Sequence, residues 1–425
     1  MLTSMHFHVD KIKMVKNHLL QYCEGLSTKE LETLRLQYNE YPKVPLLLLL
    51  HHLYEDMKSR NEQAKLAQFM KDILDHEQEE GIKTLETNHP LKVLQKENEQ
   101  FVEKIIELDT MLQTGDKIET SAHKQMIYTI YSLGQLYNHF HVKEKLLFPL
   151  MERYGHQMFT RMMWRQDDQI RGLYNGAKHM IETLREKPFE NVILTFDSFV
   201  QAFQRMIEVE NLFLFPIVYE LFNEKEWERV AAESSAYGYE IVYKPDNKSE
   251  KGDKHDTGKN NKKISDQSRE KNSTYENQKS GWKTEQFQLG GGFLTLEEAN
   301  LILNNLPVEI TFVDRNSIFK YFNERTKAED MMLIRTPLSI GRNVADCHPP
   351  KSLQKVMTLV RDLKTKKRTS ESMWFKKGDA YVYITYKGLF NEEDEFIGIL
   401  EYVQDISPFL ELPKEVKREL SPLED

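Results

Sequence analysis

Two histidines and a glutamate, His139, His141 and Glu144, lie in a segment with helical periodicity that ends on an apolar run. Imidazole and carboxylate groups together suit iron, manganese or zinc, and a helix can direct them into the core of a bundle. His141 and Glu144 are three positions apart and share one helical face. His139 and Glu144 are about 140° apart on a regular helix, so a π-bulge would be needed to bring them together. The alternative is that these residues lie on a solvated face.

Three neighbouring helical segments carry further candidates for metal binding: His89 and Glu97, then Asp167 and Asp168, then Glu208 and Glu210. Adjacent aspartates cannot share a helical face, so at most one of Asp167 and Asp168 is expected to point inward. Asp167 is also four positions before Arg171, and the two could form only a helical ion pair. Glutamate is usually a surface residue, but apolar neighbours favour burial of Glu210. His179 lies nearly on the helical face of Asp168 and is a further candidate.

A bundle of long helices must position these residues. Helical periodicity extends over residues 88–114, 121–153, 157–186 and 189–222, and a short helix is expected at 224–234. Pro90 marks a helix start, because proline is tolerated in a first turn. Four long antiparallel helices with short connections predict an up-down bundle over residues 83–238.

The remaining segments predict a mainly α chain with an α+β C-terminal domain. Residues 1–82 form a helical N-terminal region, in which Ser27 and Glu30 have the spacing of a capping box. Residues 239–289 are rich in Lys, Asn, Asp, Ser and Glu, without apolar periodicity, and predict a disordered linker rather than a nucleic-acid patch. Residues 290–412 form the second domain, and residues 413–425 are expected to be a tail.

Within residues 290–412, strands are expected at 310–314, 318–323, 369–376, 380–389 and 396–405, with short helical pieces between the second and third. This order predicts an α+β layer fold. Cys347 and His348 carry donors suited to haem or a metal, but two adjacent donors without distant partners favour a structural role. Four aromatic residues are expected to belong to the sheet and core rather than to a cofactor cage: Trp374, Tyr381, Tyr383 and Tyr386.

Composition limits the classes of function. The 425 residues suffice for two or three domains, and the net charge of -9 argues against a nucleic-acid binder that works by general electrostatics. The two cysteines, Cys23 and Cys347, give no disulfide framework and favour a reducing cytoplasm. No signal peptide is recognisable, and the longest apolar run, 44–50, is far shorter than the roughly 20 residues that cross a bilayer. We therefore expect a soluble cytoplasmic protein without a membrane or nucleic-acid partner.

Four groups of residues carry a family resemblance: His89-Pro90 with Glu97-Asn98-Glu99; His139-Phe140 with Lys143-Glu144 and Leu147-Phe148-Pro149; Met163-Trp164 with Asp167-Asp168 and Ile170-Arg171; and Met206-Ile207 with Glu210-Asn211 and Phe215-Pro216. Together they resemble the hemerythrin (HHE cation-binding) domain, in the version found in bacterial proteins of the domain of unknown function 438 family. The resemblance implies a hemerythrin-like four-helix bundle with a non-haem di-iron centre that meets oxygen, nitric oxide or peroxide.

The resemblance also implies a ligand set. The metal ligands would be His89, His139, Glu144, Asp167 and Glu210, with His141, Glu97, Asp168 and His179 as further candidates. Asp167 stands where many members have histidine, and Val209 stands where a basic residue or histidine is frequent. The site would therefore be rich in carboxylate, and hard oxygen ligands admit manganese as well as iron. This composition favours redox sensing, or a site that has lost tight metal binding, over reversible oxygen carriage.

The C-terminal domain carries a second resemblance, in the runs 306–314, 341–344, 347–352 and 398–406. These runs resemble the PAS domain that follows the hemerythrin domain in the same family. The resemblance implies a five-stranded antiparallel sheet around a small pocket whose ligand is unknown. It also implies a fold used for signal sensing and for dimer contacts.

Three hypotheses of function follow. The first is a cytoplasmic sensor or regulator in which the di-iron site responds to oxygen, nitric oxide or redox state, and the PAS domain relays the signal to an unidentified protein partner or through a homodimer. The second is an enzyme or repair protein: a di-iron oxidase, a peroxide- or nitric-oxide-handling protein, or an iron donor. The third is a metal-free interaction scaffold.

Overall fold

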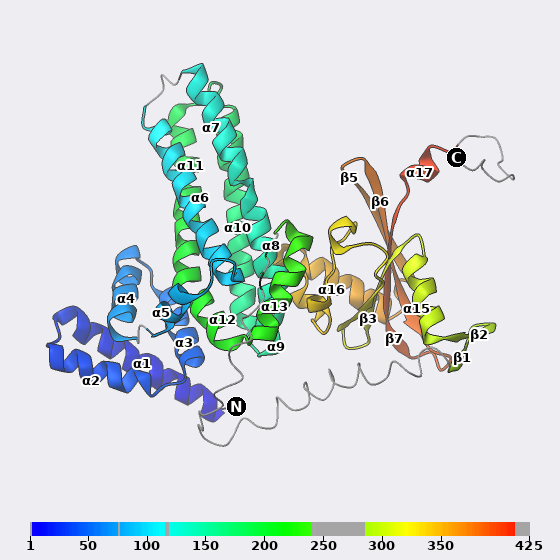
Figure 1. Cartoon of the computed structure of the whole chain (residues 1–425), viewed down its shortest axis with the longest axis horizontal. Coiled ribbons are helices and arrows are strands. Elements are labelled where there is room, and N and C mark those ends of the chain that lie inside the picture. The colour runs from blue at the N-terminus through cyan, green and yellow to red at the C-terminus, as the bar shows by residue number, and fades with distance from the viewer. Residues whose placement is uncertain are drawn as a thin grey trace. The chain divides into compact units, whose positions relative to one another are not determined.

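The computed structural model of the chain describes residues 2–74, 77–114, 119–239, 241, 243 and 285–412. They belong to two compact units, an N-terminal helical unit and a C-terminal unit built on a sheet (Figure 1). Of the expected linker, residues 239, 241, 243 and 285–289 are described, and the expected tail lies outside the described residues. Among the described helices, none combines the length and the apolar character that a membrane span requires.

Five helices precede the bundle: α1 (Leu2–Glu24), α2 (Thr28–Asn39), α3 (Lys43–Asp56), α4 (Arg60–Ile73) and α5 (Glu77–Thr84). The expected capping box of Ser27 and Glu30 is present at the start of α2. α3 packs on the bundle, because the ring centroid of His51 lies 4.7 Å from that of Phe159 and 5.1 Å from that of Phe213.

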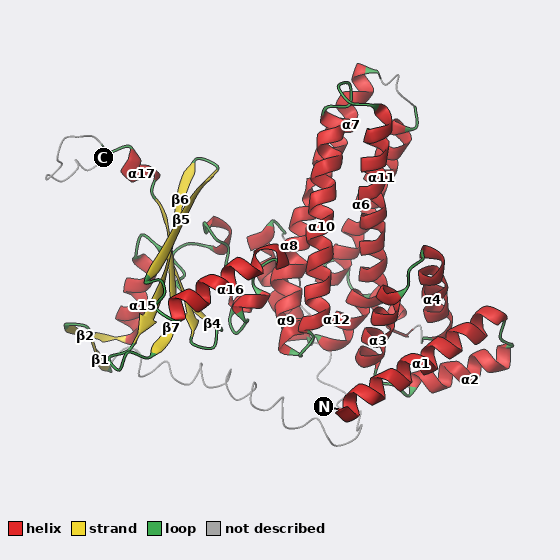
Figure 2. Cartoon of the chain, turned by 180° about the vertical axis from the view of Figure 1, so that it is seen from behind, coloured by secondary structure: helices red, strands yellow, loops and turns green. Residues whose placement is uncertain are grey.

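The bundle is built from four long arms, which lie side by side in Figure 2. The first arm is α6 (Pro90–Leu112) and the third is α10 (Gln157–Glu182). The second arm consists of α7 (Thr120–Ser132), a 3-10 turn (Leu133–Gln135), α8 (Leu136–Val142), the π-helix η2 (Lys143–Leu147) and α9 (Phe148–Arg153). The fourth consists of α11 (Phe189–Val209), the π-helix η3 (Glu210–Leu214) and α12 (Phe215–Leu221), followed by α13 (Glu224–Glu233) and the 3-10 turn η4 (Ser234–Tyr237). The expectation of a four-helix bundle is confirmed.

Both π-helices end just before a Phe-Pro pair. Pro149 and Pro216 have no N–H to donate, and a proline ring clashes with the carbonyl four residues before it. The backbone therefore widens by one residue, and the amides of Phe148 and Phe215 donate to the carbonyls of Lys143 and Glu210, five residues back. A widened turn of this kind is common at functional sites. In this chain it fixes the directions in which the side chains of η2 and η3 point.

One apolar cluster fills the bundle between α6, α7, α10 and α11. Its largest fully buried side chains include Phe101, Phe140, Phe196, Phe199 and Phe203. Their spacing along each helix follows the three- and four-residue rule for one buried face. An ordinary hydrophobic core therefore packs the four arms together.

The C-terminal unit contains β1 (Gln286–Leu289), β2 (Gly292–Thr295), α15 (Leu296–Asn305), β3 (Glu309–Asp314), β4 (Phe319–Phe322), α16 (Pro350–Lys364), β5 (Ser370–Lys377), β6 (Ala380–Phe390), β7 (Phe396–Asp405) and α17 (Ser407–Leu410). The main sheet has five antiparallel strands in the order β4-β3-β7-β6-β5, as expected. The sheet core centres on Val382, Ile384 and Val403. The separate hairpin β1–β2 begins within the segment that the sequence assigned to the linker.

Candidate functional site

Charged side chains from all four arms meet in the bundle core. We call Glu97, His139, Lys143, Glu144, Asp167, Arg171 and Glu210 the core charge cluster. Lys143 and Asp167 are completely buried, and Nζ of Lys143 lies 2.8 Å from Oδ1 of Asp167. The same ammonium also contacts Oε1 of Glu210. Lys143 therefore joins the second, third and fourth arms.

His139 links the first arm to the fourth. Its Nδ1 lies 2.8 Å from Oε2 of Glu97, and its Nε2 lies 3.1 Å from Oε2 of Glu210. Outer groups complete this part of the cluster. Asn98 donates to Glu210 at 2.6 Å, and the hydroxyl of Tyr239 donates to Glu97.

Arg171 pairs the remaining acids. Its Nη2 lies 2.8 Å from Oε1 of Glu144, and its Nη1 lies 3.1 Å from Oδ1 of Asp168. Its guanidinium carbon also lies 4.9 Å from the centroid of the Phe140 ring, within the range of a cation–π interaction. Arg171 thus forms ion pairs with Glu144 and Asp168, whereas the spacing along the helix had allowed one with Asp167.

The cluster shifts the protonation of its members. Burial alone would lower the pKa of His139, but the charge of Glu210 and the hydrogen bonds to Glu210 and Glu97 raise it to about 9. Burial would raise the pKa of Glu210, but Lys143 and His139 lower it to about 2. Burial would also lower the pKa of Lys143, and the charges of Asp167 and Glu210 raise it. At neutral pH, the imidazolium, the ammonium and the Glu210 carboxylate are all charged.

Two acids are held less firmly in the ionised form. Burial raises the pKa of Glu144 to about 7, although Arg171 opposes the shift. Burial also raises the pKa of Asp167, against the opposing charge of Lys143. Oδ2 of Asp167 has no hydrogen-bond partner among the described residues.

The other residues predicted from the sequence lie outside these contacts. His89 is the N-cap of α6; its Nδ1 accepts from the amide of Leu91 at 3.2 Å, and its ring packs on Trp227. Burial lowers the pKa of His89 to about 4. His141 is half-buried against the ring of Tyr237, and burial lowers its pKa to about 4. His179 is exposed. The structure therefore brings Glu97, His139, Glu144, Asp167 and Glu210 together, with Asp168 at the edge.

Sequence reasoning missed the roles of Lys143 and Arg171. Lys143 is four positions after His139 and so lies on the same face of the arm. It is also surrounded in sequence by Val142, Leu146 and Leu147, which are buried. That apolar surround is the signal that would have placed this lysine in the core.

The cluster does not fit a di-metal centre. Metal ligands are neutral imidazoles and free carboxylates, whereas both ring nitrogens of His139 contact carboxylates and Lys143 and Arg171 contact the acids directly. Oδ2 of Asp167 and Oδ1 of Asn98, which have no hydrogen-bond partner among the described residues, fall short of the several donors that even one metal ion takes. Among the described residues, no group of three His, Cys, Asp or Glu side chains is arranged to hold a metal ion.

A surface groove of ≈ 540 Å³ lies elsewhere in the helical unit. Its lining includes Glu55, Arg60, Arg165 and Arg205. Nη2 of Arg205 lies 3.0 Å from Glu55, and Arg60 donates to the carbonyl of Gln201 at 2.8 Å. Two of its three arginines are thus already engaged within the protein.

The C-terminal unit holds an internal ion-pair network and an exposed aromatic strip. Arg335 pairs with Glu309 at 3.4 Å and with Glu401. Nδ1 of His348 lies 2.8 Å from the carbonyl oxygen of Val344, which agrees with the structural role expected for it. The aromatic residues lie on β5 and β6 as expected, but Trp374 and Tyr381 are exposed and do not belong to the core.

The comparisons with known proteins match one family model to the helical unit and another to the C-terminal unit. Residues 89–218 match the family model of the hemerythrin HHE cation binding domain, and residues 299–407 match that of the PAS domain. Among solved structures, the chain is similar to the C-terminal domain of a protein from Streptococcus mutans, with 47% identity over 31% of this chain and 99% of that one (TM-score 0.30). It is also similar to a sensory box sensor histidine kinase from Vibrio cholerae, with 12% identity over 26% and 90% of the two chains (TM-score 0.20). No match was found among curated proteins.

Proposed function

Because the chain carries a hemerythrin HHE cation-binding domain followed by a C-terminal PAS domain, we propose that it is a sensor or regulatory protein that acts through protein contacts. The bundle and the PAS domain are the two modules, and the protein would pass on its signal through a contact made by the PAS sheet. The proposed partner in that contact is a second copy of the chain.

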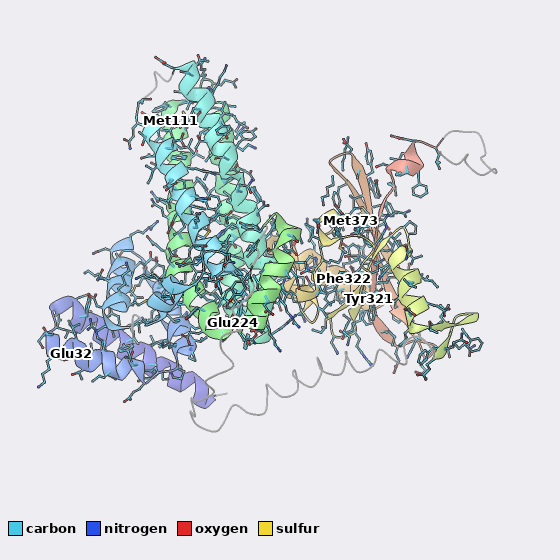
Figure 3. The ribbon with its side chains drawn as sticks, in the orientation of Figure 1. Glu32, Met111, Glu224, Tyr321, Phe322 and Met373 are labelled. Carbon is cyan, nitrogen blue, oxygen red and sulfur yellow. The ribbon has the colours of Figure 1, made fainter. Side chains whose placement is uncertain are left out.

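The observation that carries this proposal is the exposed strip on β5, one of the two edge strands of the five-stranded sheet. Met373, which Figure 3 labels, is exposed, and so are Trp374 and Phe375. Trp374 retains 67% of its accessible surface. An edge strand offers unpaired backbone groups for pairing with another chain, and exposed apolar patches mark contact surfaces. Antiparallel pairing of β5 with its copy would give the self-complementary interface of a twofold dimer.

Light scattering on the full chain at micromolar concentration tests the contact. The wild type should have the mass of a dimer, and Trp374→Ser should shift the mass towards that of a monomer. Tyr128→Ser is the matched control, because Tyr128 is an aromatic residue of α7 that is 71% exposed and lies outside the sheet. A monomeric wild type, or an equal effect of both substitutions, would contradict self-association through β5.

The geometry of the core charge cluster favours the metal-free form of this regulator over a di-iron sensor of oxygen, nitric oxide or redox state. The di-iron sensor is supported by the match to a cation-binding family. An oxidase, a peroxide- or nitric-oxide-handling enzyme or an iron donor would need the same centre. Each of these alternatives requires Lys143 to leave Asp167 and Glu210, which are its two buried partners.

A further inference from the structure

We propose that Lys143 takes the place of a metal ion in the core charge cluster, so that this bundle is assembled around an internal cation and needs no metal. The inference concerns the bundle alone and does not depend on the contact proposed for β5.

The first support is the position of the ammonium. Lys143 is fully buried, and its Nζ lies between Oδ1 of Asp167 on α10 and Oε1 of Glu210 on η3. A metal ion in a helical bundle does the same work, because it bridges carboxylates that project inward from facing helices. An ammonium does this with directed N–H donors and a single positive charge.

The second support is an internal correspondence between the second and fourth arms. Lys143 is the first residue of η2 and stands six positions before Pro149; Glu210 is the first residue of η3 and stands six positions before Pro216. The two arms therefore present equivalent positions to the core, one as a base and the other as an acid. If residue 143 were an acid like its counterpart Glu210, its carboxylate would face Glu210 and Asp167 from the position that the ammonium occupies.

The third support is charge compensation. Lysine or arginine already pairs with three acids of the cluster: Lys143 with Asp167 and Glu210, and Arg171 with Glu144. A divalent ion that shared these carboxylates would lie within a few ångströms of the ammonium. Like charges at that separation repel strongly in a buried site. The ammonium and a bound metal are therefore mutually exclusive.

Substitution of Lys143 in the full chain tests the proposal. Lys143→Glu supplies a carboxylate at the cation's position, and Lys143→Ala leaves room for an ion between Asp167 and Glu210. Lys124→Glu is the matched control, because Lys124 is an exposed lysine on α7 of the same arm. Each protein is purified from iron-replete cells without a histidine tag, its metal content is measured, and its Tm is recorded with EDTA and with added Fe(II), Mn(II) or Zn(II).

The wild type and Lys124→Glu should contain substoichiometric metal and show the same Tm in every condition. Lys143→Glu should have a lower Tm in EDTA and regain several degrees with Fe(II) or Mn(II), because an ion that binds only the folded state stabilises it. Lys143→Ala should show the same dependence if Lys143→Glu does not fold.

Two results would overturn the proposal. Stoichiometric metal in the wild type, with a fall in Tm when it is removed, would show that Lys143 does not replace the ion. A metal-free wild type together with variants at residue 143 that ignore added metal would show that Lys143 is an ordinary buried ion pair. Neither result bears on the mass measured by light scattering, so the proposed function and this inference can fail separately.

Discussion

Nζ of Lys143 and Oδ1 of Asp167 lie 2.8 Å apart in the completely buried core of the bundle, on arms separated by 24 positions in the sequence. Burying either charge alone would be unfavourable, because the interior cannot replace the water that it loses. The pair therefore exists only when both arms are in place. It couples the polar core to the correct assembly of the helices.

Replacing Lys143 with methionine should destabilise the helical unit by about 3–5 kcal/mol, the usual cost of removing one partner from a buried ion pair. Asp167 and Glu210 would lose their shared cation, and one of them would have to take up a proton. Urea unfolding followed by far-UV circular dichroism measures the loss. Lys124→Met, on the exposed face of α7, should change the stability by less than about 0.5 kcal/mol. Similar values for the two variants would mean that Lys143 is solvated.

Arg171→Lys should destabilise the helical unit by about 1–2 kcal/mol, although the charge is kept. Arginine reaches Glu144 and Asp168 with two different nitrogens, at 2.8 and 3.1 Å. A lysine ammonium is a single point and cannot hold both acids in that geometry. Arg165→Lys, at an exposed position of the same helix, is the control in urea unfolding. A loss no larger than that of the control would contradict a role for the guanidinium fork.

His51 should make the helical unit acid-sensitive. Burial, together with the charges of His52 and Arg205, lowers its pKa from 6.5 to about 4, although Glu55 lies 3.9 Å away. Because the folded-state pKa is depressed, the stabilisation is complete above pH 6.5 and is lost as the pH falls towards 4. The shift corresponds to at most about 3 kcal/mol.

Urea unfolding at pH 7 and pH 4.5 measures this effect. His51→Leu should lose less stability than the wild type between the two pH values, because leucine fills the space between Phe159 and Phe213 without taking up a proton. His52→Leu, at the neighbouring exposed position, should follow the wild type. Equal acid sensitivity of His51→Leu and the wild type would assign the effect to other groups.

The arrangement of the arms and of the sheet could be predicted from the sequence, because each rests on local periodicity and on helix signals such as Pro90 and the Ser27–Glu30 pair. The π-helix that the spacing of His139 and Glu144 called for is present as η2. It does not join those two residues, which instead contact Glu210 and Arg171. Local spacing fixes where a side chain points but not which distant residue it meets.

The buried partners of Lys143 could not be predicted from the sequence. Lysine is almost always a surface residue unless it is paired, and its partners here lie 24 and 67 positions away in the sequence. Strand β1 escaped prediction for a different reason. All four of its residues are exposed, so the alternation of apolar and polar residues that marks a half-buried strand is missing.

Gly398→Ala should loosen the pairing of β7 with β3 in the C-terminal sheet. A Cβ at residue 398 would lie 2.2 Å from the carbonyl oxygen of Val313 and 2.7 Å from the ring of Phe312, so the strands would have to separate. Overpacking of this kind lowers the free energy of unfolding by about 1–3 kcal/mol. Because the sheet then opens more often, the amides of β3 and β7 should exchange hydrogen roughly 5- to 100-fold faster. Gly291→Ala is the control, because a Cβ there meets nothing within 4 Å. Unchanged protection of β7 in Gly398→Ala would mean that the sheet accommodates the methyl group by moving the Phe312 ring and the strand backbone at little cost.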